Sequence, residues 1–258
     1  MSAVEFDHII YATIPFKGYG VRAWSSREKL ENFRQAFQEW YVPFEQNTIR
    51  PGYEARAVVK TPTDEVYLAR IFTKEKMDEK GRTSIVSHIV EIPVDLLKQG
   101  LPLELVDSEM AKLTVGPVGV GEIPKLRFVW EKQGEDPDIK YLRDHVDEET
   151  ARRILMGYAK PRPRVIIVYK RDYWERIRLV YALTKLLVEA GVKTFSIFSD
   201  VPPDHIVKIF NAPTIVTNFM PRIRPSEDWT VVNIKTGEKE AGQTDIESVL
   251  RKIYGERR

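Results

Sequence analysis

The chain has 258 residues, of which 43% are hydrophobic, and this is enough to bury one large core or two smaller ones. Its 40 basic and 38 acidic residues nearly cancel, which argues against a dedicated nucleic-acid-binding protein, where one sign of charge dominates a face. The absence of cysteine excludes disulfides, thiolate catalysis and cysteine-ligated zinc.

No apolar run approaches the roughly 20 residues that cross a bilayer. The amino-terminal sequence MSAVEFDH has neither the basic nor the apolar region of a signal peptide. We therefore expect a soluble, cytoplasmic protein without a membrane partner. Abundant Lys, Arg and Glu, with few Asn and Gln, also fit a thermophile's composition.

The pattern at the start of the chain predicts a strand, a turn and a helix. Glu5–Ile14 is expected to be one strand, which a glycine-containing turn at Pro15–Gly20 ends. Ser25, with Glu28 three residues later, predicts a capping box at the start of a helix. The apolar face of that helix would consist of Leu30, Phe33, Phe37 and Trp40.

The next segments alternate in a way that is typical of strands. Ala55–Lys60 and Val66–Thr73 flank the turn sequence Thr61–Asp64, which predicts a hairpin. Thr83–Ile92 and Leu126–Trp130 are expected to be further strands, and Ile139–Tyr158 to be largely helical.

The sequence Lys-Pro-Arg-Pro-Arg at Lys160–Arg164 is the clearest candidate for a domain boundary, because two prolines prevent regular helix and favour an extended spacer. We therefore expect two domains. Residues 1–160 would form an α+β domain with an antiparallel or mixed sheet, and residues 161–258 a small α/β domain with a mainly parallel sheet.

The second part begins with a fully apolar strand, Val165–Tyr169, of the kind that is buried on both faces of a parallel sheet. Asp172 and Glu175 then predict a capped helix that ends at Gly191. The remaining elements expected here are strands at Thr194–Phe198, Pro213–Thr217 and Trp229–Ile234, a short helix at Pro203–Phe210, and a terminal helix opening at Thr244–Glu247. This β-α-β-α-β order favours right-handed crossovers and parallel pairing.

One motif suggests a cofactor. The sequence from Gly18 to Ala23 fits the G-x-G-x-x-G/A fingerprint, whose glycines let the backbone approach a pyrophosphate. That unit should continue into a second strand that ends in an acidic residue about 20 residues on, but a loop at Val42–Asn47 follows instead. We therefore favour a simple glycine turn and expect no cofactor.

Metal-site and catalytic patterns are likewise missing from the sequence. The histidines share no metal-ligand spacing, and neither a nucleophile elbow nor another catalytic signature occurs; we expect no metal site and assign no catalytic residue. The histidines are His8, His88, His145 and His205.

Four residues form our candidate ligand-binding site: Arg22, Ser25, Arg82 and His88. Arg22 precedes the expected helix start, where free backbone N–H groups favour an anion. Arg82 enters the strand that carries His88, and antiparallel pairing with the strand at Ile9–Ile14 would bring these ends together. The alternative is that both arginines are solvated and His88 is an ordinary core histidine.

The order of these signals over residues 6–95 resembles the N-terminal domain of GTPase-associated proteins of bacteria and archaea. Members of that family open with an apolar strand, Gly-Tyr, a small residue and Ser, matched here by Gly18-Tyr19, Ala23 and Ser25. They later carry Gly-Arg followed by a His inside a strand, matched by Gly81-Arg82 and His88. The resemblance implies association with small GTPases in a regulatory or conflict-response setting, without an established catalytic activity.

Our leading interpretation is a non-catalytic regulatory or adaptor protein with a protein partner, a small GTPase by the resemblance. The alternative is an enzyme or nucleotide-binding protein with a ligand between the two parts, at the carboxyl ends of the parallel strands. Those ends fall near Lys170–Asp172, Ser199-Asp200 and Thr217-Asn218. Nucleic-acid binding through Arg162, Arg164, Arg222 and Arg224 is disfavoured by the near-neutral net charge.

Overall fold

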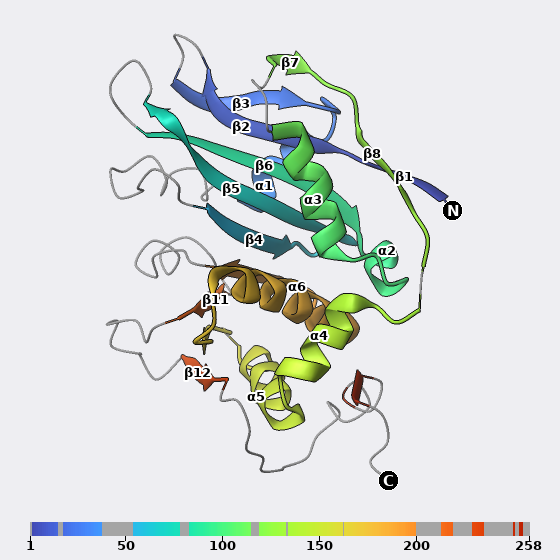
Figure 1. The fold of residues 1–258 in the computed structure, drawn as a ribbon, viewed down its shortest axis with the longest axis vertical. Coiled ribbons are helices and arrows are strands. Elements are labelled where there is room, and N and C mark those ends of the chain that lie inside the picture. Colours follow the sequence, from blue (N-terminus) through green and yellow to red (C-terminus); the bar gives the residue numbers. More distant parts are fainter. Residues whose placement is uncertain are drawn as a thin grey trace.

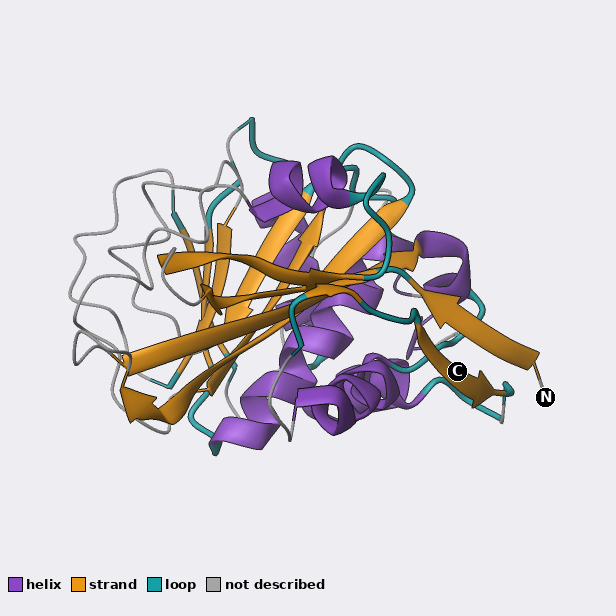
Figure 2. Cartoon of the chain, turned by 90° about the horizontal axis from the view of Figure 1, so that it is seen from above, coloured by secondary structure: helices purple, strands orange, loops and turns teal. Residues whose placement is uncertain are grey.

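A computed structural model describes residues 2–14, 18–37, 54–77, 83–114, 119–132, 134–161, 163–199, 213–218, 229–234, 250 and 253–254. Within these residues, a mixed sheet of ten strands has the order β12-β9-β11-β10-β4-β5-β6-β2-β3-β7, and a separate ribbon pairs β1 with β8. The sheet is flanked by helices on both sides (Figure 2). The protein therefore has a mixed α/β fold built on one large sheet.

The strands are β1 (Ser2–Phe6), β2 (His8–Ile14), β3 (Gly18–Trp24), β4 (Glu54–Lys60), β5 (Glu65–Met77), β6 (Thr83–Pro93), β7 (Gly121–Glu122), β8 (Leu126–Trp130), β9 (Val165–Val168), β10 (Phe195–Ser199), β11 (Pro213–Thr217) and β12 (Thr230–Asn233). The helices are α1 (Leu30–Phe37), α2 (Val94–Lys98), α3 (Leu103–Thr114), α4 (Pro137–His145), α5 (Glu148–Tyr158) and α6 (Tyr173–Glu189).

In the first part of the sheet, the pairing from β4 through β5, β6 and β2 to β3 is antiparallel, and the short edge strand β7 is parallel to β3. The hairpin of β4 and β5 is confirmed, as is the antiparallel pairing of β2 with β6, in which Ile10 lies opposite His88. In the second part, β9 is parallel to both β11 and β12, and β11 is parallel to β10. The expectation of a parallel sheet after the Lys160–Arg164 segment is therefore confirmed.

The division into two domains is not confirmed, because the sheet runs across the expected boundary. Strand β10 pairs antiparallel with β4, with Ile197 opposite Val58. Two prolines fix the local conformation of the Lys160–Arg164 segment, but they do not prevent the strands on either side of it from joining one sheet.

Helix α6 holds the two parts together. Every residue from Leu179 to Val188 is buried, as is typical of a helix that is covered on all sides. It contacts β4, β10 and β11 on the sheet and α2, α3 and α4 beside it. In Figure 1, α3 and α6 lie in front of the strands and α1 lies behind them.

A buried lysine fixes α6 to the neighbouring chain segments. The Lys185 ammonium donates to the carbonyls of Leu97 and Leu101, at 2.8 and 2.7 Å, and contacts Asp136 Oδ2 at 2.8 Å. Asp136 also caps α4 by accepting from the Asp138 N–H. This contact links α6, the segment between α2 and α3, and the start of α4.

Three local expectations are wrong. Gly18–Ala23 is not a turn but most of strand β3, antiparallel to β2, since Tyr19, Val21 and Trp24 favour a strand and pairing satisfies the backbone. The strand–turn–helix of a dinucleotide fingerprint therefore does not form here. Glu5–Ile14 is two strands rather than one, because β1 leaves the main sheet at Asp7 to pair with β8.

The third error concerns the start of the first helix. Helix α1 begins at Leu30 and not next to Ser25, whose hydroxyl has other partners. The expectation that Ile139–Tyr158 is largely helical is confirmed. The segment forms two helices, because Val146 is extended and Asp147 caps α5 by accepting from the Thr150 N–H. The capped start of α6 at Asp172 is confirmed by its bond from the Glu175 N–H. The helices expected at residues 203–210 and 244–247 lie outside the described residues.

Candidate functional site

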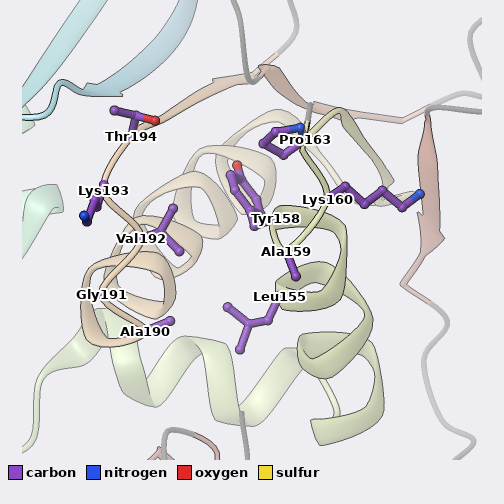
Figure 3. A pocket seen from close by; sticks show the side chains of 10 residues that line it. All are labelled: Leu155, Tyr158, Ala159, Lys160, Pro163, Ala190, Gly191, Val192, Lys193 and Thr194. Atoms are coloured by element: carbon purple, nitrogen blue, oxygen red, sulfur yellow. The ribbon is translucent and has the colours of Figure 1, made fainter. Parts of the chain in front are cut away.

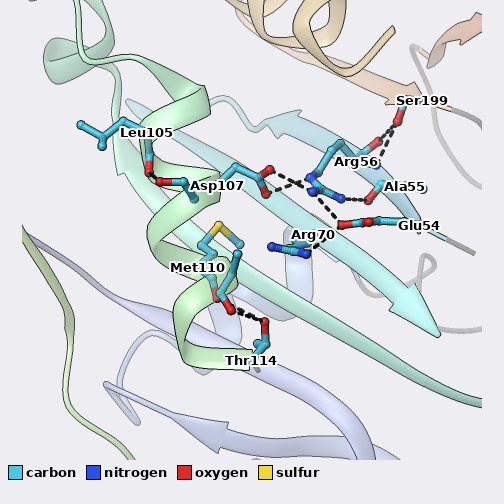
Figure 4. Close-up of polar contacts among 11 residues, drawn as sticks. Glu54, Ala55, Arg56, Arg70, Leu105, Asp107, Met110, Thr114 and Ser199 are labelled. Atoms are coloured by element: carbon cyan, nitrogen blue, oxygen red, sulfur yellow. Dashed lines mark hydrogen bonds and ion pairs between the residues drawn. The ribbon is translucent and has the colours of Figure 1, made fainter. Parts of the chain in front are cut away.

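A row of polar side chains crosses the sheet beneath α3 (Figure 4). Arg56 on β4 lies opposite Arg70 on β5, and Arg70 lies opposite His88 on β6. At the β10 end of the row, the backbone N–H of Arg56 donates to Ser199 Oγ at 2.9 Å. We call these four residues the transverse row; it brings two arginines and a histidine onto one covered face of the sheet.

Arg56 is the most strongly held member of the row. Its Nε and Nη2 donate to the two carboxylate oxygens of Asp107 on α3, at 2.8 and 2.9 Å, and Nη2 also donates to Glu54 at 2.9 Å. Arg70 contacts the same Glu54 oxygen at 2.9 Å. Burial acts to lower the pKa of Arg56, but the Asp107 carboxylate outweighs it and the pKa is raised. This fork geometry fixes α3 to the sheet.

The histidine end of the row is a buried imidazole pair. His8 Nδ1 and His88 Nε2 are 2.8 Å apart, and His8 Nε2 lies 2.8 Å from the carbonyl of Pro124. A carbonyl only accepts, so His8 carries its proton on Nε2, and His88 Nε2 must then donate to His8 Nδ1. The remaining ring nitrogen, His88 Nδ1, is buried and makes no hydrogen bond within the described part of the chain, although the Met110 carbonyl lies near the ring.

Burial keeps both imidazoles neutral. It lowers the pKa of His88 to about 3, and the neighbouring His8 and Arg70 act in the same direction, against the nearby backbone carbonyl of Met110. Burial also lowers the pKa of His8, although the Pro124 carbonyl and Asp7 oppose that shift. A neutral, enclosed pair of this kind supports the fold more readily than it transfers protons to a substrate.

Ser25 lies next to the histidine pair and contacts the His8 backbone and the Asp7 carboxylate. Its hydroxyl accepts from the His8 N–H at 2.8 Å and donates to Asp7 Oδ1 at 3.1 Å. Lys125 contacts the other Asp7 oxygen at 3.3 Å. Both ring nitrogens of His8 are occupied by His88 and Pro124, so His8 does not serve as the base that activates a serine in a hydrolase triad.

The structure brings together two of the four residues of the predicted site. Ser25 and His88 both contact His8, Ser25 at its backbone N–H and His88 at its ring. Arg22 donates instead to the Gly119 carbonyl at 3.4 Å, two residues before β7 at the sheet edge. Arg82 lies outside the described residues, as do Arg162, Arg222 and Arg224 of the nucleic-acid alternative.

Sequence reasoning missed both arginines of the transverse row and two of the row's hydrogen-bond partners, His8 and Asp107. His8, Arg70 and Asp107 carried no motif that marked them. Arg56 did offer a signal, because a single charge inside the apolar strand sequence Ala55–Val59 indicates a buried ion pair. Its partner on α3 lies 51 residues further along the chain, and local pattern does not identify it.

The structure also contains a hollow of about 520 Å³. It lies between the end of α5 and the turn from α6 to β10, beside the amino ends of the parallel strands (Figure 3). The lining residues are Leu155, Tyr158, Ala159, Lys160, Pro163, Ala190, Gly191, Val192, Lys193 and Thr194. The sequence alternative placed a ligand at the opposite, carboxyl ends, where Ser199 is fully buried and bonded to Arg56.

No family model and no curated protein matches the chain. Within the described residues, no helix combines the length and apolar content needed to cross a bilayer. The same residues contain no group of three or more His, Asp or Glu side chains placed to hold a metal ion.

Proposed function

We propose that the chain is a non-catalytic regulatory or adaptor protein that acts by binding a protein partner, and that this partner is a small GTPase. The partner class rests on the resemblance of residues 6–95 to GTPase-associated proteins. The non-catalytic role is supported by the transverse row, in which Arg56 and His88 are fully buried and serve the packing of α3 and β2.

The observation that carries the proposal is the exposure of Trp174, of which 58% is accessible to solvent. Tryptophan and arginine contribute more binding energy to protein interfaces than other side chains do. Trp174 lies in the first turn of α6, and Arg178, one turn later, shares its side of the helix. Lys170 and Arg171, both exposed, precede the same helix. We call these four residues the α6 patch.

The α6 patch is partly pre-organised. The Trp174 ring packs edge-on against Tyr173, with ring centroids 5.3 Å apart. Arg178 contacts Glu104 and Glu175, at 3.4 and 3.7 Å. An ordered aromatic ring loses less conformational freedom on binding than a free one. The complementary partner surface is an apolar hollow with acidic groups opposite Lys170 and Arg171.

Titration calorimetry tests the proposal with the full chain and a small GTPase from the same organism, loaded with GDP or with a non-hydrolysable GTP analogue. We expect binding in one nucleotide state and a loss of about 30-fold in affinity for Trp174→Ala. Val129→Ala is the matched control, because Val129 on β8 is 61% exposed but outside the α6 patch. Absence of binding in both nucleotide states, or equal affinities for the two variants, would contradict the proposal.

A further inference from the structure

We infer that the hollow between α5 and the α6–β10 turn binds a small organic anion with an apolar body. This inference does not depend on the GTPase proposal, because the hollow shares no residue with the α6 patch. Its volume of about 520 Å³ is that of a site for a small molecule.

The walls of the hollow favour an apolar body. Leu155, Ala159, Pro163, Ala190 and Val192 line it, and the Tyr158 ring stands at its centre in Figure 3. Tyr158, Ala190 and Val192 also pack against the main hydrophobic core. A ligand that covers these side chains removes apolar surface from water, which favours binding.

The charges around the hollow favour an anion. Among the described residues that line it, Lys160 and Lys193 are the charged ones and none is acidic. They lie on opposite sides of the hollow in Figure 3, where the Lys160 side chain extends away from its centre. The Lys60 ammonium donates to the Lys193 carbonyl at 3.1 Å and adds a third positive charge nearby. These cations make the electrostatic potential around the hollow positive, which favours an anionic group at its mouth.

Lys160 and Lys193 could serve helix stability instead of ligand binding. Helices α5 and α6 both end here, with C-caps at Ala159 and Ala190, and cations stabilise the carboxyl ends of helices. If this were their whole role, removal of Lys160 or Lys193 would lower the melting temperature and leave the affinity for an anion unchanged.

The hollow is preformed by the backbone around it. Gly191 has a φ of 67°, in the left-handed region, and the bond from the Val192 N–H to the Leu187 carbonyl closes the end of α6. On the other wall, Gly157 lies so close to β9 that an added Cβ would be 3.0 Å from Val165 Cγ2. The Tyr158 and Thr214 hydroxyls are hydrogen-bonded to each other. These contacts already fix the walls of the hollow, so a ligand would bind with only a small loss of conformational entropy.

The test compares two fluorescent probes that share an apolar body. One is 8-anilinonaphthalene-1-sulfonate, an anion, and the other is N-phenyl-1-naphthylamine, which is neutral. We expect saturable binding of both probes at one site on the full chain. Lys160→Gln and Lys193→Gln should each weaken the anionic probe about threefold, as for a partly exposed charge, and leave the neutral probe unchanged. Lys140→Gln, on the exposed side of α4, is the matched control and should affect neither probe.

A further variant tests whether the probes bind in this hollow. Ala159→Trp places a large ring in the space and should abolish binding of both probes while the thermal transition is retained. The inference is overturned if binding is not saturable, or if Ala159→Trp leaves it intact. It is also overturned if the lysine variants bind both probes as the unaltered protein does, because the site would then not select an anion.

Discussion

His8 and His88 are the residues in which burial and hydrogen bonding have their clearest measurable consequence. Burial lowers the pKa of both, so the native pair stays neutral where unfolded histidines take up protons. Their contribution to stability is therefore present above the unfolded pKa of about 6.5 and is lost as pH falls toward about 3.

We expect the free energy of unfolding to fall below pH 6.5 by as much as about 1.4 kcal/mol per pH unit for each histidine. Substituting His88→Gln keeps a donor for His8 but removes one titrating group, so the slope should be smaller than in the unaltered protein by up to about 1.4 kcal/mol per pH unit. Urea denaturation at several pH values between 7 and 4 measures the slope. An identical slope in the variant would show that His88 does not titrate on unfolding.

The raised pKa of Asp138 predicts a stability that falls, rather than rises, with increasing pH. Burial raises its pKa to about 7, against the influence of Lys185, and its Oδ2 accepts from the Leu103 N–H at 2.9 Å. Because the native state holds this proton more tightly, the stability it contributes is fully present below the unfolded pKa and is lost as pH rises through about 7.

Asp138→Asn should therefore melt at a higher temperature than the unaltered protein at pH 8 and at a similar temperature at pH 4. The amide oxygen can still accept from the Leu103 N–H, so the contact is kept. Thermal melting followed by circular dichroism at both pH values tests this, with Asp144→Asn, exposed on the same helix, as the control. A variant that is less stable at pH 8 would mean that the Asp138 carboxylate is needed in charged form.

At the scale of elements, the attachment of α3 depends on the Arg56–Asp107 pair. Arg56→Met would leave Asp107 buried without a cation, which costs about 3–5 kcal/mol. The double variant Arg56→Met, Asp107→Leu should recover most of that loss, since neither charge remains buried. Urea denaturation of the single and double variants gives the coupling energy. If the two losses simply add, the pair does not hold α3 as described.

The elements that the sequence predicts correctly are those whose pattern is local. The hairpin of β4 and β5 follows from the turn at Thr61–Asp64, and the start of α6 from its cap at Asp172. At Gly18–Ala23 the two glycines favour a turn, whereas the neighbouring Tyr19 and Val21 favour a strand. Strand pairing with β2, a non-local contact, decides that segment.

The candidate site was predicted only in part, for the same reason. The sequence predicts the antiparallel pairing of β2 with β6. This pairing places His88 beside His8, whose backbone N–H donates to Ser25. His8 was missed because its partners, His88 and Pro124, are 80 and 116 residues away. Contacts over such separations leave no pattern in a single sequence.

On the scale of the whole molecule, the continuous sheet predicts cooperative unfolding. Strand β10 pairs with β4, and α6 packs on both. We expect one calorimetric transition whose enthalpy equals the van't Hoff enthalpy. We also expect residues 1–160 alone to lack a cooperative transition, since Val58 and its neighbours on β4 would lose their cover. Two resolved transitions, or a folded 1–160 fragment, would instead support two domains.

The pairing of β4 with β10 also has a consequence for synthesis. Strand β4 ends at Lys60, but its partner begins at Phe195, so the ribosome must translate most of the chain before that edge can be covered. At about 5–20 residues per second this interval lasts for several seconds or more. Throughout it, the nascent chain presents an unpaired strand edge with apolar neighbours, which can pair with another chain. A ribosome that stalls between these two strands releases a chain prone to aggregate rather than a smaller working protein.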